Sequence, residues 1–204
     1  MTTLHRSFVP DAPPVLPNAS RIGLIVFMAV ATTLFSLLLF AYAMRMREPD
    51  WQPIPHPALL WWNTGALVLA SIAMQRARQL TSLHRAAWLV SSGVLAAVFV
   101  IGQLTAWRML SAAGQTVTAN PSNSFLYLLT GLHGLHVLGG LVAWAVTIAR
   151  LQRGDPFRTQ RAISLCAIYW HFLLAVWLVL LAAMWWITPG LVAAICGPLY
   201  GAAP

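Results

Sequence analysis

Five long uncharged apolar stretches constrain the fold of this chain more than any other feature. Short segments that carry the charged residues separate them. An α-helix rises 1.5 Å per residue, so a bilayer core of about 30 Å needs about 20 helical residues. The pattern therefore predicts an all-α integral membrane protein with five transmembrane helices in a bundle. The stretches cover residues 22–44, 58–74, 86–107, 125–149 and 162–187.

The composition excludes an ordinary soluble domain. Hydrophobic residues make up 59% of the chain and charged residues only 8%, whereas roughly 25% of the residues in an average globular protein are charged. A chain with so few polar groups cannot cover its own surface with them. We expect lipid to cover part of it.

The second stretch, residues 58–74, is the shortest of the five. Three prolines between residues 53 and 57 stop any helix before Ala58. Trp61 and Trp62 follow and suit the aromatic belt of a membrane interface. These flanks favour a transmembrane helix here as well.

Three regions are expected along the chain. Residues 1–20 are rich in proline and predict an irregular N-terminal arm. Residues 21–187 form one five-helix transmembrane domain, whose first stretch is too long for the core of a signal peptide. Residues 188–204 form an uncharged C-terminal tail, where prolines and glycines argue against a sixth spanning helix.

All twelve basic residues are arginines, and their placement predicts the orientation. Short cytoplasmic loops collect positive residues. Nine arginines lie on one side, in the arm and in the second and fourth gaps, and three lie on the other side. We expect a bacterial-type cytoplasmic membrane, a cytoplasmic N-terminus and an outward C-terminus. Because the arginines form no patch, the net charge of +8 does not indicate nucleic-acid binding.

None of the five stretches contains a carboxylate, so a proton or ion path within this chain alone is not indicated. The titratable residues at depth are His133, His136 and His171. They could hold a metal ion or a haem. Two histidines on adjacent turns of one helix do not supply opposed axial ligands, however, and no Cys, Asp or Glu stands nearby in sequence. We therefore expect no metal site, and expect each imidazole to bond a neighbouring carbonyl, side chain or lipid head group.

Two motifs carry a resemblance to a known family. The run from Asn123 to Gly140 reads NSFLYLLTGLHGLHVLGG and resembles the Thr-Gly-x-His-Gly-x-His-Val helix of cytochrome c oxidase subunit III. The run from Tyr169 to Trp177 reads YWHFLLAVW and is similar to the final helix of that family. The resemblance extends from Gly23 to Trp186 and matches the short, five-helix form of this haem-copper oxidase family.

The resemblance implies a noncatalytic subunit of a proton-pumping terminal oxidase in aerobic electron transport. Such a subunit lies beside the catalytic subunit I, with subunit II in the same complex. Haem and copper belong to those partners, and this chain would carry no cofactor except phospholipid held in a cleft between helix groups. The subunit would stabilise the catalytic subunit and support its proton uptake.

Site roles transfer only where the motifs match. His133, His136, Tyr169, Trp170 and His171 are then structural and interhelical contacts, and Arg76 and Arg78 are candidates for binding lipid phosphate. No catalytic residue is expected.

Two positions depart from the family pattern. Ala31 stands where the first helix usually has a buried glutamate, and Leu174 replaces an aspartate of the final helix. A role of those carboxylates in proton handling does not carry over to this chain.

Two alternatives remain open from the sequence. One is the related accessory protein of nitric oxide reductase, against which the spelling TGLHGLHV over residues 130–137 favours the oxidase. The other is a small membrane b-type cytochrome that uses His171 with His133 or His136 as axial ligands. The sequence leaves the electron donor open between cytochrome c and quinol.

Overall fold

The computed structural model describes residues 19–52, 58–80, 84–153 and 156–196, with side chains up to residue 194. Within these residues the regular secondary structure is entirely α-helical, which agrees with the all-α class expected from the sequence. The helices are α1 (Ala19–Arg45), α2 (Leu59–Gln79), α3 (His84–Ala112), α4 (Pro121–Gln152), α5 (Pro156–Trp186) and α6 (Pro189–Cys196).

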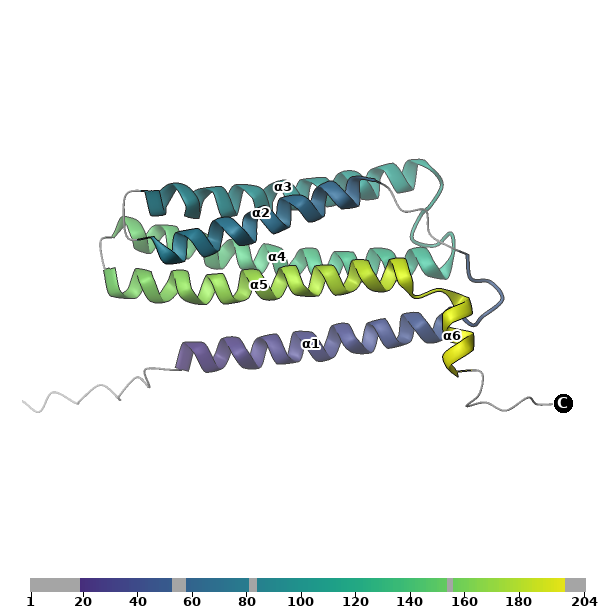
Figure 1. Ribbon diagram of the computed structural model, residues 1–204. Helices are drawn as coiled ribbons and strands as arrows, with labels where there is room; N and C mark the ends of the chain where they lie inside the picture. Colours follow the sequence, from purple (N-terminus) through teal and green to yellow (C-terminus); the bar gives the residue numbers. More distant parts are fainter. Residues whose placement is uncertain (1–18, 53–57, 81–83, 154–155, 197–204) are drawn as a thin grey trace, which may run out of the picture.

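The five long helices run up and down in one bundle (Figure 1). Helix α2 packs along α3, while α5 packs against both α4 and α2. Helix α1 lies at the edge of the bundle and contacts α5 and α4. The short helix α6 crosses the end of the bundle where α1 and α5 finish.

Four helices are long and apolar enough to cross a membrane, namely α1, α3, α4 and α5. Helix α2 has 21 residues but does not join this group. Its last turns, from Gln75 to Gln79, carry two arginines and lower its apolar character. The chain is thus a multi-pass membrane protein with four candidate spans, by length and composition, in the described part.

The helices extend beyond the uncharged stretches of the sequence. Helix α5 begins at Pro156 and includes Arg158 and Arg161 in its first turns. A helix satisfies its own backbone groups at any depth, and arginine side chains can reach water from a helix end. The edges of the apolar runs therefore do not coincide with the ends of the helices.

The C-terminal tail is not wholly irregular. Helix α6 begins with Pro189, a favourable first residue, and the Leu191 N–H donates to Thr188 Oγ1 over 3.3 Å. Its eight residues are too few to cross a membrane. Residues 1–18 of the expected arm and residues 197–204 of the tail lie outside the described residues.

The main core lies between α2, α3, α4 and α5. Trp170 and Trp177 of α5 are fully buried there, beside Phe99 of α3 and Leu67 of α2. Helix α1 contributes Phe35 to a second, smaller cluster. This packing places the histidine-bearing face of α4 against the buried tryptophans of α5.

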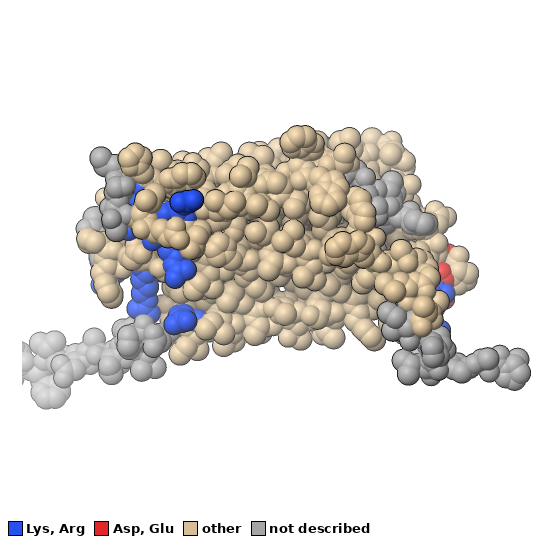
Figure 2. Space-filling view, viewed as in Figure 1, with Lys and Arg blue, Asp and Glu red and all other residues tan. Residues whose placement is uncertain are grey.

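Arginines gather at one end of the bundle, as Figure 2 shows. We call this end the arginine-rich end; its described arginines are Arg21, Arg76, Arg78, Arg85, Arg150, Arg153, Arg158 and Arg161. The opposite end holds both described acidic residues, Glu48 and Asp50.

Candidate interhelical site

His133 lies on α4 in the middle of an aromatic enclosure. Its side chain is fully buried, and its ring centroid is 5.6 Å from that of Phe99, 5.2 Å from that of Trp177 and 6.4 Å from that of Phe35. Neither ring nitrogen has a hydrogen-bond partner among the described residues. The described residues therefore supply no hydrogen bond to this imidazole, and it packs against aromatic rings.

His136, one turn further along α4, is half-buried and bonded within its own helix. Its Nδ1 lies 2.8 Å from the carbonyl oxygen of Leu132. Its own carbonyl accepts a 3.0 Å hydrogen bond from the Tyr169 hydroxyl on α5. The ring of Phe27 packs against both side chains, with centroid distances of 5.8 Å to His136 and 5.9 Å to Tyr169. This contact joins α1, α4 and α5.

Gly140 allows α5 to approach α4 at the next turn. A Cβ atom at this position would lie 3.1 Å from Tyr169 Cε1, 3.2 Å from Leu173 Cδ1 and 3.3 Å from Trp170 Cζ3. These separations are tighter than ordinary van der Waals contact, so a side chain here would force these neighbouring side chains on α5 to shift. The neighbouring Gly139 has open space around it.

His171 and Trp170 are neighbours on α5 but face different surroundings. Trp170 is buried, and its indole N–H has no partner among the described residues. His171 is exposed and bonds across to α2, with Nδ1 2.5 Å from Ser71 Oγ and Nε2 3.2 Å from Gln75 Oε1. The pair links α5 to the core on one side and to α2 on the other.

Arg76 and Arg78 both lie on the last turns of α2, and both are exposed. The backbone around them is fixed, because Gln160 Nε2 donates to the Arg78 carbonyl over 3.3 Å and Arg85 Nη2 donates to Gln160 Oε1 over 2.7 Å. Arginine forks suit phosphate oxygens. These two side chains are therefore placed where a lipid phosphate at the membrane surface could meet them.

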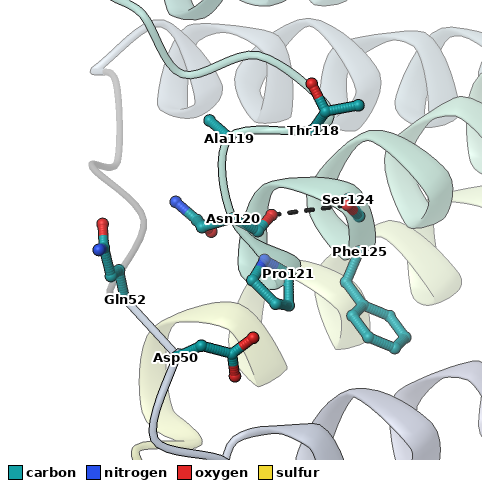
Figure 3. A pocket seen from close by; sticks show the side chains of 8 residues that line it. All are labelled: Asp50, Gln52, Thr118, Ala119, Asn120, Pro121, Ser124 and Phe125. Atoms are coloured by element: carbon teal, nitrogen blue, oxygen red, sulfur yellow. Dashed lines mark hydrogen bonds between the residues drawn. The ribbon is translucent and has the colours of Figure 1, made fainter.

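A polar pocket of about 580 Å³ lies at the opposite end of the bundle, where the link after α1 meets the link before α4 (Figure 3). Asn120 caps α4 in this pocket by accepting from the Asn123 N–H over 3.0 Å. Ser122 donates to the Gln52 carbonyl over 2.5 Å and so ties the two links together. These hydrogen bonds hold the link after α1 against the start of α4.

The Asp50 carboxylate at the edge of this pocket forms a two-pronged pair with Arg45. Nη1 lies 2.7 Å from Oδ1, and Nη2 lies 2.6 Å from Oδ2. The hydrogen bonds from Arg45 lower the pKa of Asp50 below its ordinary value. The carboxylate therefore stays ionised at neutral pH.

Three contact residues were not identified from the sequence: Ser71 and Gln75, which meet His171, and Thr64, whose hydroxyl accepts from Trp177 Nε1 over 2.9 Å. A signal does exist, because polar residues at helical spacing inside an apolar stretch occupy one face of a helix. Ser71 and Gln75 are four residues apart. Their partner on α5 cannot be read from that spacing.

The three intramembrane histidines do not converge on a common centre. His133 faces Phe99 and Trp177, His136 bonds within α4, and His171 bonds to α2. Among the described residues no group of three or more His, Cys, Asp or Glu side chains could hold a metal ion. The arrangement can join helices and bury aromatic surface.

Comparison with known proteins identifies the family. The family model described as cytochrome c oxidase subunit III matches residues 14–188. A probable cytochrome c oxidase subunit 3 of Mycobacterium tuberculosis is 29% identical over 184 residues, covering 84% of this chain and 89% of the relative.

Cyanobacterial relatives agree. Cytochrome c oxidase subunit 3 of Thermostichus vulcanus is 26% identical over 184 residues, with 84% of this chain and 89% of the relative covered. The protein of that name from Synechocystis is 29% identical over 175 residues, with 80% and 74% covered. These matches favour neither the nitric oxide reductase accessory protein nor a b-type cytochrome. The chain belongs to the cytochrome c oxidase subunit III family.

Proposed function

We propose that this chain is a noncatalytic structural subunit of a cytochrome c oxidase-type terminal oxidase, which stabilises the catalytic subunit beside it. The proposal rests on the hydrogen bonds that residues of the two family motifs make between helices. Tyr169 and His136 join α5 to α4, and His171 joins α5 to α2. These motif residues therefore form contacts that hold neighbouring helices together.

In this proposal α2 is the fifth span, and the arginine-rich end faces the cytoplasm. At 21 residues α2 is about 31 Å long, enough for the hydrocarbon core. It lies between α3 and α5 and runs alongside them. With five spans the N-terminus is cytoplasmic and the C-terminus faces outward, which agrees with the preference of cytoplasmic loops for arginine.

The same proposal assigns the redox centres to the partner subunits. A b-type cytochrome that uses two histidines as axial ligands needs their imidazoles on opposite sides of one iron. His133 and His136 lie on adjacent turns of one helix, and His171 turns toward α2. This geometry supports a chain without haem or copper, beside subunits I and II that carry them.

Phospholipid is the one ligand that we assign to this chain. Arg76 and Arg78 lie at the arginine-rich end and suit a lipid phosphate. Support of proton uptake would then depend on position and bound lipid, since Ala31 and Leu174 supply no carboxylate within the spans.

Purification of the oxidase through an affinity tag on this chain tests the proposal. We expect equimolar recovery of a haem- and copper-containing subunit, while the chain expressed alone shows no Soret band. One haem per isolated chain, lost in His171→Ala, would favour a b-type cytochrome. Recovery with a nitric oxide reductase instead of an oxidase would favour the accessory protein.

A further inference from the structure

An exposed imidazole lies deep within the apolar length of α5. His171 stands ten residues after Arg161 and fourteen before Trp185, or about 15 Å and about 21 Å along the helix at 1.5 Å per residue. Ionisable side chains at such depth face protein or a water-filled cavity rather than lipid tails. The exposure of His171 is therefore informative about what covers it.

The neighbouring Gln75 adds polar groups that reach the outside of the bundle. Because Gln75 Oε1 accepts from His171 Nε2, Nδ1 is left to accept from the Ser71 hydroxyl. The amide nitrogen of Gln75 has two N–H donors beyond this bond. Facing lipid tails they would lack an acceptor, which is costly.

Other outward faces of the bundle differ from this one. The exposed side chains of α4 include Leu135, Leu138 and Val142, all apolar. Several exposed hydroxyl groups on α1 and α3 donate hydrogen bonds to backbone carbonyls of their own helix. Thr33 donates to the Ala29 carbonyl, and Thr105 donates to the Ile101 carbonyl. These faces suit lipid directly.

Two grooves flank α5 on the side of His171. One, of about 420 Å³, lies between α2 and α5 toward the outer end, with Trp61 and Trp185 at its sides and Leu178 within it. The other, of about 220 Å³, lies between α1 and α5 and includes Ala175 and the exposed Ser36. We call α5 with these two grooves and the His171–Gln75 pair the α5 face.

Positive charge marks the arginine-rich edge of this face, where the proposed function places lipid phosphate. Arg76 and Arg78 lie on α2 within one turn of Gln75, and no acidic residue lies at this end among the described residues. Like charges that face each other across an interface are costly, so a partner helix carries no excess of positive charge at this level.

Resting on the proposed function, we infer that the α5 face is the surface by which this chain packs against a transmembrane helix of another oxidase subunit. That helix presents a hydrogen-bond acceptor at the level of Gln75 and no excess of positive charge near Arg78. Its apolar side chains fill the grooves beside Leu178.

Site-specific photocrosslinking in the intact oxidase tests the inference. A photoreactive amino acid replaces Leu178 on the α5 face or, as the matched control, Leu138 on α4. The two leucines are 44% and 47% exposed, so both are accessible to whatever covers them. We expect Leu178 to crosslink to another oxidase subunit with a yield several-fold above that of Leu138, which should crosslink mainly to lipid.

The outcomes separate the two proposals. Crosslinks of Leu178 to lipid alone, or to a second copy of this chain, in an assembled oxidase would overturn the α5 face and leave the proposed function intact. Equal yields at Leu138 and Leu178 would also overturn it. Failure of the chain to purify with any oxidase subunit, before irradiation, would overturn the proposed function itself.

Discussion

The hydroxyl of Tyr169 donates a 3.0 Å hydrogen bond to the backbone carbonyl of His136. This bond lies one turn from Gly140, where the absence of a side chain lets α5 come close enough for the hydroxyl to reach. A tyrosine on one helix and a glycine on the other therefore act together. The two halves of the family motif meet at this point.

Tyr169→Phe removes the hydrogen bond and keeps the ring against Phe27 and Phe172. We expect a loss of about 1 kcal/mol in stability, the usual net value of one hydrogen bond, seen as a small fall in the thermal midpoint of the purified oxidase. Tyr169→Ala should cost more, because ring packing is lost as well. Equal losses of stability in the two variants would mean that the hydroxyl, and not the packing of the ring, supplies all of the stabilisation by this side chain.

The existence of the long helices could be predicted from this sequence, because an uncharged apolar run of about 20 residues matches the thickness of a bilayer core. Helix ends could not, because arginines such as Arg158 and Arg161 continue a helix beyond the apolar run. The short helix α6 was missed for a related reason. The prolines and glycines of the tail argue against a sixth spanning helix, but Pro189 at a first helical position is compatible with a short one.

The candidate site was predictable only in part. The sequence indicates that His133 and His136 share a face of one helix, but His133 lies among rings without a hydrogen bond while His136 bonds to Leu132. The partner of His171 is Ser71, a hundred residues away. Such a pairing follows from how α2 and α5 pack, which local spacing does not specify.

Gly140→Val should separate α4 from α5, whereas Gly139→Val serves as the matched control. A Cβ at Gly140 would already lie 3.1 Å from Tyr169, whereas a Cβ at Gly139 would meet no neighbour. Overpacking of this kind costs typically about 1 to 3 kcal/mol. We expect loss of the chain from the purified oxidase, or a lower thermal midpoint, for Gly140→Val alone. Similar behaviour of the two variants would contradict the close approach.

Two of the motif histidines should differ in their response to apolar replacement. His171→Leu leaves the buried Ser71 hydroxyl without its partner, at a cost of about 1 to 3 kcal/mol. His133→Phe strands no partner, because neither ring nitrogen is bonded within the described residues. Thermal unfolding of the two variants compares them directly. A larger loss for His133→Phe would show that its imidazole has a polar contact beyond those described.

The Arg45–Asp50 pair predicts a specific dependence on pH. The pKa of Asp50 is lowered in the folded state by hydrogen bonds from Arg45, so its stabilising contribution is fully present above the ordinary aspartate pKa of about 3.9. The contribution is lost as the pH falls through the lowered value. The difference in thermal midpoint between wild type and Asp50→Asn should be constant near neutral pH and shrink in acid. Because the pair lies at the surface, high salt should also reduce this difference in thermal midpoint. A difference that grows in acid would contradict the pairing.

Hydrophobic carbodiimides, which modify protonated carboxylic acids within membranes, test the expectation that this chain has no acid buried in its spans. Ala31 is buried on α1 between Phe27 and Phe35, whose rings face His136. A glutamate here would be desolvated and hence protonated at ordinary pH.

In wild type, both described acids, Glu48 and Asp50, follow the end of α1, and Asp50 is held ionised by Arg45. We therefore expect mass spectrometry of the intact oxidase to detect no stoichiometric label on the wild-type chain. Ala31→Glu should be labelled, while Ala31→Gln, of the same size but without an acid, should not. Stoichiometric modification of wild type at Glu48 or Asp50 would mean that the link after α1 enters the membrane instead of lying at its surface.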